Sequence, residues 1–207
     1  MKIRMIALAG VAALALSTPA MAAEGWYLGL GAGWDSQLGI KATSVPVPAY
    51  TGKTQSSSGA IIAGAVGYAW DNGIRIENEV AWTGHDLKGG GTRVGYSAVT
   101  TDMMNLVWDI PLDDSWKLSI GGGVGLGAVR AHIQAPAVVG VADVVNGSKT
   151  GLAFQGIAGI AYALSPDVDL FAEYRYREVD ATGNRRSGFA ALSPIKLGPA
   201  QENVVMM

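Results

Sequence analysis

The stretch that decides the fold is residues 25–36, GWYLGLGAGWDS, in which bulky apolar residues alternate with small ones. Trp26, Leu28 and Leu30 share one parity, while Gly29 and Gly31 share the other. Successive side chains of a β-strand point to opposite faces of the sheet. The period of two therefore predicts a strand with one apolar face and one face of little bulk.

The same alternation returns along the chain and predicts seven complete strands and part of an eighth. The predicted strands are Gly25–Ser36, Gly59–Trp70, Ile74–Gly84, Val99–Ile110, Trp116–Arg130, Gly151–Leu164 and Asp169–Asp180, with the eighth from about Gln201 to Met207. We expect an all-β fold, an eight-stranded antiparallel up-and-down transmembrane β-barrel whose eighth strand is incomplete at the C-terminus.

The predicted connections alternate in length. Those after the second, fourth and sixth strands have only a few residues, rich in Asp, Asn, Pro and Gly. The other connections are long, and they are Gln37–Ser58, His85–Ala98, Ala131–Thr150 and Ala181–Ala200. Short turns at one end and long loops at the other are typical of barrels of the bacterial outer membrane.

The two faces of the predicted strands distinguish a membrane barrel from a soluble one. Residues 74–82 read IRIENEVAW, with isoleucine, valine and tryptophan on one parity and arginine and two glutamates on the other. Charges share their parity with Gly and Ser, which suit a narrow interior, and the opposite parity forms an apolar belt too large for a soluble monomer. A soluble ligand-binding barrel would need the two faces reversed.

The predicted interior carries four positive and four negative side chains. They are Arg75, Glu77, Glu79, Asp109, Lys117, Glu173, Arg175 and Arg177. Since the third and seventh strands lie on opposite walls of an eight-stranded barrel, we expect Glu77 and Glu79 to pair with Arg175 and Arg177. Such pairs would close the lumen, because side chains fill a barrel of this size. The alternative is a narrow porin-like channel for small solutes, for which the inward glycines leave room.

All six tryptophans fall at or near predicted strand ends. They are Trp26, Trp34, Trp70, Trp82, Trp108 and Trp116. Indole rings prefer the membrane–water interface, so we expect these residues to form aromatic girdles at the two rims.

Composition excludes several classes of function. The chain has 207 residues, a formal net charge of −2 and no cysteine. The absence of cysteine excludes a disulfide scaffold, cysteine–zinc sites and thiol catalysis. The near-neutral charge argues against nucleic acid as a partner, because phosphate binding requires a basic excess.

The first 22 residues predict a signal peptide rather than part of the fold. Lys2 and Arg4 precede an apolar run that is too short to span a bilayer, and Ala20 and Ala22 fit an A-x-A cleavage pattern. We therefore expect an exported protein with the barrel domain at residues 23–207, located in the cell outer membrane.

Several stretches resemble the OmpA-type small outer membrane β-barrel family, also described as porin-family proteins. They are NLVWDIP (105–111), GGGVGLGA (121–128) and FQGIAGIAYALSPDVDLFAEYRYRE (154–178). The resemblance covers the mature chain and implies a role in envelope integrity, adhesion or surface interaction, without enzymatic activity. Family members often end their last strand on an aromatic residue, whereas this sequence ends NVVMM. We therefore expect the native chain to continue past Met207, and the alternative is a barrel that closes on a short strand.

No motif predicts catalysis, a cofactor or a metal site. The only histidines, His85 and His132, lie near the long-loop rim and lack a His-x-Ser pair, so a solvated loop position is expected for both. The basic spot Asn184–Arg186 suits either lipopolysaccharide phosphates or a solvated loop tip. Expected partners are outer membrane lipid and lipopolysaccharide, together with host or envelope surface ligands bound by the long loops, and the protein is expected to be a monomer.

Overall fold

The computed structural model describes residues 24–38, 41–44, 51–53, 55–56, 58–89, 92–133, 145–165, 168–181, 183–185 and 195–207. Eight long strands build the main sheet: β1 (Gly25–Leu38), β5 (Ser58–Ala69), β6 (Ile74–Gly89), β7 (Thr92–Pro111), β8 (Trp116–Ile133), β9 (Val145–Ser165), β10 (Val168–Asp180) and β13 (Ala200–Met206). Among the described residues, no helix is long and apolar enough to cross a membrane. The predicted signal peptide, residues 1–22, lies outside the described residues.

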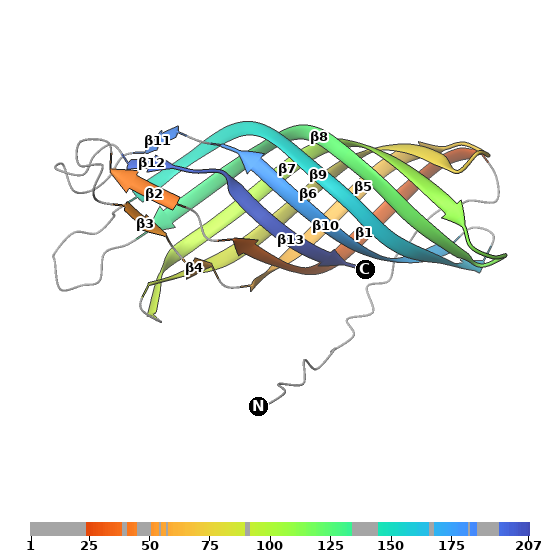
Figure 1. Ribbon diagram of the computed structural model, residues 1–207, viewed down its shortest axis with the longest axis horizontal. Coiled ribbons are helices and arrows are strands. Elements are labelled where there is room, and N and C mark those ends of the chain that lie inside the picture. Colours follow the sequence, from red (N-terminus) through yellow and green to blue (C-terminus); the bar gives the residue numbers. More distant parts are fainter. Residues whose placement is uncertain are drawn as a thin grey trace, which may run out of the picture.

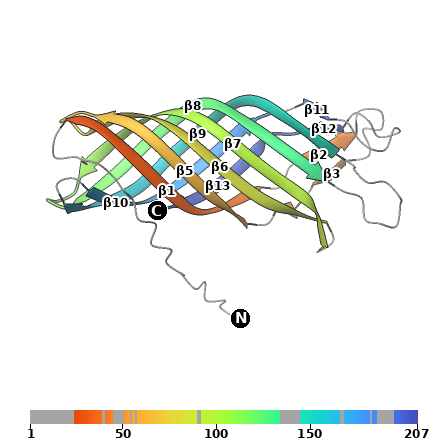
Figure 2. The ribbon, with the colours of Figure 1, turned by 180° about the vertical axis from the view of Figure 1, so that it is seen from behind.

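The main sheet closes into a barrel. Each strand pairs antiparallel with its neighbour in chain order, and β13 pairs with both β10 and β1. Figures 1 and 2 show these strands wrapping around the barrel axis at a steep tilt, with β10 and β13 beside each other in both views. The predicted eight-stranded antiparallel up-and-down barrel is confirmed. The seam is paired along the long-loop half of the two strands, where β13 pairs with β1 over Gly33–Leu38 and with β10 over Glu173–Val179. Paired backbone of this kind is the arrangement that lipid requires of strands.

Side chains alternate between a buried interior and an exposed outer belt. On β7, Met103 is 0% exposed whereas the next residue, Met104, is 46% exposed. The same contrast separates inward Glu79, at 1%, from outward Val80, at 51%. The outer belt is therefore apolar at mid-height, and the inner face holds the charges.

One carboxylate departs from this pattern. Asp102 of β7 is exposed on the outer face and accepts a hydrogen bond of 2.7 Å from Asn78 Nδ2 of β6. It lies two residues from Thr100, whose partner across the ladder is Trp82. Since a strand rises ~3.4 Å per residue, Asp102 is only about 7 Å along the strand from the level of that tryptophan. A charge so near the rim costs much less than one at mid-bilayer.

Two short turns at the barrel end away from the long loops are fixed by local hydrogen bonds. Gly73 closes the β5–β6 turn with a φ of 81°, a conformation that favours glycine. In the β7–β8 turn, Asp113 accepts backbone hydrogen bonds of 2.8 Å from Ser115 and Trp116. These two donors hold the pKa of the exposed Asp113 carboxyl below its usual range.

The predicted long loops contain more strand than expected. The predicted His85–Ala98 loop is wrong, because β6 runs to Gly89, β7 begins at Thr92, and the ladder between them continues to their ends. Likewise β8 reaches Ile133 and β9 begins at Val145, inside the predicted Ala131–Thr150 loop. Beyond the belt the outward side chains meet water, so the alternation that marks the spanning segments fades while the backbone ladder persists.

The remaining two predicted loops form a small second sheet. Its strands are β2 (Lys41–Ser44), β3 (Thr51–Lys53), β11 (Gly183–Arg185) and β12 (Ile195–Leu197), in the order β11-β12-β2-β3. A further short strand, β4 (Gln55–Ser56), pairs with the end of β6. The small sheet lies at the end of the barrel opposite the short turns (Figure 1). Of the basic spot, Asn184 and Arg185 belong to β11, and residue 186 lies outside the described residues.

The apolar belt can be tested by placing one charge on it. Val124 is 51% exposed midway along β8, opposite Met104 and Phe154. We expect Val124→Arg to lower the free energy of unfolding from lipid bilayers by ~2–4 kcal/mol, because arginine then faces hydrocarbon. Reversible urea unfolding in liposomes measures this.

The matched control is Leu112→Arg in the β7–β8 turn, where Leu112 is 60% exposed beyond the belt. It should leave the unfolding free energy within about 0.5 kcal/mol of the wild-type value. Equal costs for the two substitutions would contradict the assignment of β8's outer face to lipid.

Candidate functional site: the barrel interior

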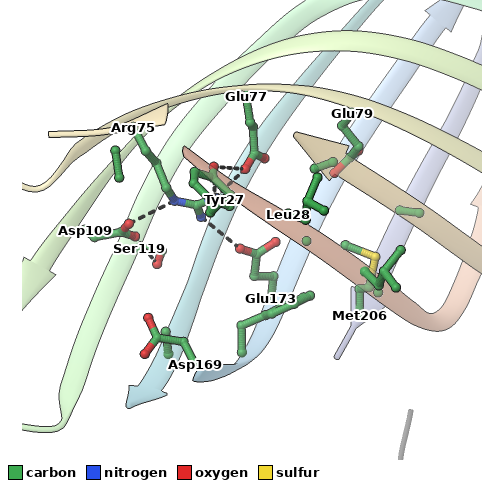
Figure 3. A pocket seen from close by; sticks show the side chains of 18 of the residues that line it. Tyr27, Leu28, Arg75, Glu77, Glu79, Asp109, Ser119, Asp169, Glu173 and Met206 are labelled. Atoms are coloured by element: carbon green, nitrogen blue, oxygen red, sulfur yellow. Dashed lines mark hydrogen bonds and ion pairs between the residues drawn. The ribbon is translucent and has the colours of Figure 1, made fainter. Parts of the chain in front are cut away.

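The short-turn half of the lumen is organised around Arg75 of β6 (Figure 3). Its guanidinium pairs with Glu77 on the same strand, with Asp109 of β7 at 2.9 Å and with Glu173 of β10 at 3.4 Å. Tyr27 of β1 donates a hydrogen bond of 2.6 Å to Glu77 and accepts one of 3.1 Å from Arg75. One arginine thus joins four strands through charge-assisted hydrogen bonds, which are the stronger kind.

A second arginine lies one layer further along the lumen. Arg175 of β10 pairs with Glu79 on the opposite wall and donates hydrogen bonds of 3.0 and 2.6 Å to Glu173 on its own strand. Gln155 of β9 donates to Glu79 at 3.4 Å and to Asn105 at 2.8 Å, and Asn105 donates to Glu77 at 3.0 Å. The two arginine layers therefore form one continuous polar network across the barrel.

One more ion pair lies at the short-turn end of the network. Lys117 of β8 lies 2.9 Å from Asp169 of β10. Asp169 was not among the predicted interior charges, although its parity in β10 matches that of Glu173 and Arg175. The sequence analysis missed Asp169 because this residue lies at the very start of its predicted strand.

A cavity of about 110 Å³ lies among these side chains. Tyr27, Arg75, Asp109, Glu173 and Met206 are among its lining residues, and they surround the space seen in Figure 3. On β6 the lining ends at Glu79 and on β10 at Arg175. The cavity thus occupies the short-turn half of the lumen and stops at the Glu79–Arg175 layer.

Beyond that layer, apolar side chains occupy much of the lumen. Val99, Met103, Val179 and Val204 are all 0% exposed, and Ile61 is 1% exposed. They belong to two buried clusters formed by facing strands. This half of the interior is packed as the core of a soluble domain is packed.

The inward glycines leave space that interior side chains occupy, so they do not open a channel through the barrel. A Cβ at Gly159 would approach Cγ of Glu173 to 2.6 Å, and one at Gly127 would approach Cγ1 of Val179 to 2.5 Å. A Cβ at Gly123 would likewise collide with the amide of Asn105. The side chains of neighbouring strands occupy the space that each glycine frees.

Near the long-loop end, a third group of polar side chains is buried. Arg177 of β10 is 0% exposed, donates to Thr101 at 3.0 Å and lies 3.8 Å from a carboxylate oxygen of Glu202. Thr83 donates to the other oxygen of Glu202 at 2.9 Å. Close by, Nε2 of His85 contacts the carboxylate of Asp35.

The structure places all eight predicted interior charges inside the barrel, but their pairing differs from expectation. Of the expected cross-lumen pairs, Glu79–Arg175 forms. Glu77 instead faces Arg75, and Arg177 faces Glu202. Arg177 lies two residues beyond Arg175 along the tilted strand, where the opposing wall presents Thr101 and β13 presents Glu202.

Sequence reasoning missed Asp35, His85 and Glu202. The expectation that His85 is a solvated loop residue is wrong, because His85 lies within β6 and is only 4% exposed. His85 shares the inward parity of Glu77 and Glu79, and β6 continues past its predicted end, so the parity would have predicted a buried His85. The other histidine, His132, lies on β8 with its ring centroid 5.4 Å from that of Tyr96.

The six tryptophans lie on the outer surface at two levels. Trp26, Trp70, Trp108 and Trp116 lie toward the short turns, where Trp26 and Trp116 contact Tyr68 and Tyr162 across the ladder with ring centroids 5.5 and 4.9 Å apart. Trp34 and Trp82 lie toward the long loops and are 49% and 45% exposed. Two such levels are what an aromatic girdle at each bilayer interface requires.

Comparison with known proteins identifies the family. The model of the outer membrane protein β-barrel domain matches residues 6–191. The chain belongs to this family. No curated protein gives a significant match.

Solved structures with the same fold are distant in sequence. The outer membrane protein OprG from Pseudomonas aeruginosa matches with a TM-score of 0.57 at 14% identity, over 88% of this chain and 94% of OprG. Neisserial surface protein A gives a TM-score of 0.46 at 18% identity, over 86% and 94% of the two chains. The attachment invasion locus protein Ail of Yersinia pestis gives 0.42 at 14% identity, over 89% and 100%. The likeness to OprG, at 14% identity, shows the fold alone.

The cross-lumen pair Glu79–Arg175 gives a direct test of the network. Both side chains are at most 4% exposed, so Glu79→Gln would leave a buried guanidinium short of one counter-charge. Because Glu173 still faces Arg175, we expect a loss near the lower end of the ~3–5 kcal/mol typical of broken buried pairs. Urea unfolding in liposomes measures the loss.

Glu178→Gln is the matched control. Glu178 lies on β10, the strand of Arg175. It is only half-buried and accepts a hydrogen bond of 2.9 Å from Gln201. Its substitution should change the unfolding free energy by about 0.5 kcal/mol or less. A Glu79→Gln variant as stable as the control would show that the network does not hold the barrel together.

Proposed function

We propose that the protein is a non-enzymatic, non-conducting barrel of the outer membrane that supports the envelope and presents a rigid surface outside the cell. The observation that carries this proposal is the filled lumen. Ion pairs cross its short-turn half, and apolar side chains with no exposed surface pack its long-loop half. Family membership and the apolar belt support an outer membrane location.

The surface role rests on the strands that extend beyond the girdle. From Trp82 to Gly89, β6 continues for seven residues, and the ladder with β7 reaches the end. At ~3.4 Å per residue this is about 24 Å along the strand. The small sheet of β2, β3, β11 and β12 lies at the same end (Figure 1). Paired backbone holds such an extension rigid, which suits contact with lipopolysaccharide, envelope components or host surfaces.

The proposal includes export by cleavage of a signal peptide at residues 1–22, and a monomer surrounded by outer membrane lipid. It assigns no cofactor. The inward charges act as structural ion pairs, and the tryptophans act as interfacial anchors.

A narrow channel is the second candidate. The cavity of about 110 Å³ in the short-turn half favours it, because a space of that size holds water and charged side chains such as Arg75 and Glu173 are among its lining residues. A channel would need a second opening past Val99, Met103 and Val179, all of which are completely buried.

Single-channel recording in planar bilayers separates the two candidates. We expect the refolded full chain to give no stable conductance steps in 1 M KCl, since the packed half of the lumen blocks ions. Folding of each sample is verified by the heat-dependent shift in electrophoretic mobility. Reproducible steps from verified folded protein would overturn the closed-barrel proposal in favour of the channel.

A further inference from the structure

Three side chains outside the network of Arg75 and Arg175 meet near the long-loop end of the lumen. Asp35 lies on β1, His85 on β6 and Glu202 on β13. Each offers one ligand atom, and these atoms all lie within 4.8 Å of one another. We propose that Asp35, His85 and Glu202 form a binding site for a first-row divalent transition metal such as Zn²⁺.

The donor set fits this class of ion. One imidazole nitrogen and two carboxylate oxygens suit Zn²⁺ and its neighbours, whereas Ca²⁺ and Mg²⁺ prefer oxygen ligands alone. In a tetrahedral site with bonds of ~2.1 Å, ligand atoms lie about 3.4 Å apart. Side-chain adjustments of roughly 1 Å bring atoms separated by up to 4.8 Å to that spacing.

Unsatisfied atoms provide independent support. Oδ2 of Asp35, Nδ1 of His85 and Oε2 of Glu202 are inaccessible and have no hydrogen-bond partner. The three residues are 2%, 4% and 0% exposed. Buried polar atoms without partners are costly. A proton shared between His85 and Asp35 would satisfy their contact but leave Oδ2 of Asp35 without a hydrogen bond and Oε2 of Glu202 with only the Arg177 guanidinium at 3.8 Å, whereas a bound cation can be ligated by both carboxylates.

The surrounding charges favour a cation. Asp35 and Glu202 contribute two negative charges, against one positive charge from Arg177, which lies 3.8 Å from Glu202. With a neutral imidazole the cluster carries a net charge of −1. Since Arg177 weakens the attraction, we expect micromolar affinity.

Gly59 shapes the wall beside the imidazole. It is the ladder partner of Asp35 in β5, and a Cβ there would lie 2.6 Å from Cδ2 and 2.9 Å from Nε2 of His85. The missing side chain lets the His85 ring sit flush against β5, facing Asp35. A bound metal would then tie β6 to β1 and β13, the strands at which the barrel closes.

Isothermal titration of the untagged full chain in detergent micelles with ZnCl₂ tests the proposal. Background binding is low because the sequence has two histidines and no cysteine. We expect one Zn²⁺ per chain with a dissociation constant of 10 µM or tighter, on the order of −7 kcal/mol. His85→Gln should weaken binding at least tenfold, and His132→Gln, at the same end of the barrel, should not. Absence of binding at 100 µM Zn²⁺, or equal affinity of the His85→Gln variant, overturns the proposal.

If the His85→Gln variant does not fold, nuclear magnetic resonance on protein that retains His85 tests the site instead. Protein labelled with ¹⁵N-histidine gives two imidazole spin systems, which the His132→Gln variant assigns. Zn²⁺ should shift the His85 nitrogens alone, and equimolar Mg²⁺ should shift neither residue. Unchanged His85 signals at saturating Zn²⁺ would refute the site.

Discussion

The structure depends on one constraint: in hydrocarbon, every backbone N–H and C=O must find a partner within the protein. Strands meet it by closing into a ring, and here β13 completes the ring between β10 and β1. Closure fixes which parity of each strand faces inward. The outer parity must then be apolar, and every charge in a spanning segment must find a counter-charge inside or lie near a rim, as Asp102 does beside Asn78.

The barrel interior is a packed core rather than a pore, and its composition changes from charged to mainly apolar along the barrel axis. Arg75 and Arg175 gather carboxylates of β6, β7 and β10 in the short-turn half. Valine, methionine and isoleucine pack the other half around a smaller buried polar group that includes Arg177 and Glu202. Inward glycines accommodate the long side chains that face them, such as Glu173 beside Gly159. Buried ion pairs gain little over apolar packing in stability alone. In a barrel they also fix strand register, because Glu79 meets Arg175 only when β6 and β10 are correctly placed.

Most of the fold could be predicted from period-two alternation, because lipid and lumen impose opposite demands on neighbouring residues. Where that contrast ends, prediction failed: residues 85–98 continue the β6–β7 ladder in water, where outward side chains need not be apolar. The interior charges followed from parity, but their partners did not. Pairing depends on strand register, because Arg177 and Glu202 are ladder partners in β10 and β13. His85 was missed because β6 extends beyond the apolar pattern. Asp35 lies within the predicted strand Gly25–Ser36, on the same parity as its glycines, and was missed although that parity faces inward.

The central claim, a lipid-embedded barrel with a charged interior, is tested most directly by electrophoresis of isolated outer membranes with and without boiling. Folded membrane barrels resist detergent until heated. We expect the protein to pellet with the outer membrane and to change mobility only after boiling. Recovery in the soluble periplasmic fraction, with the same mobility before and after heating, would contradict it and would mean that the apolar parity faces inward.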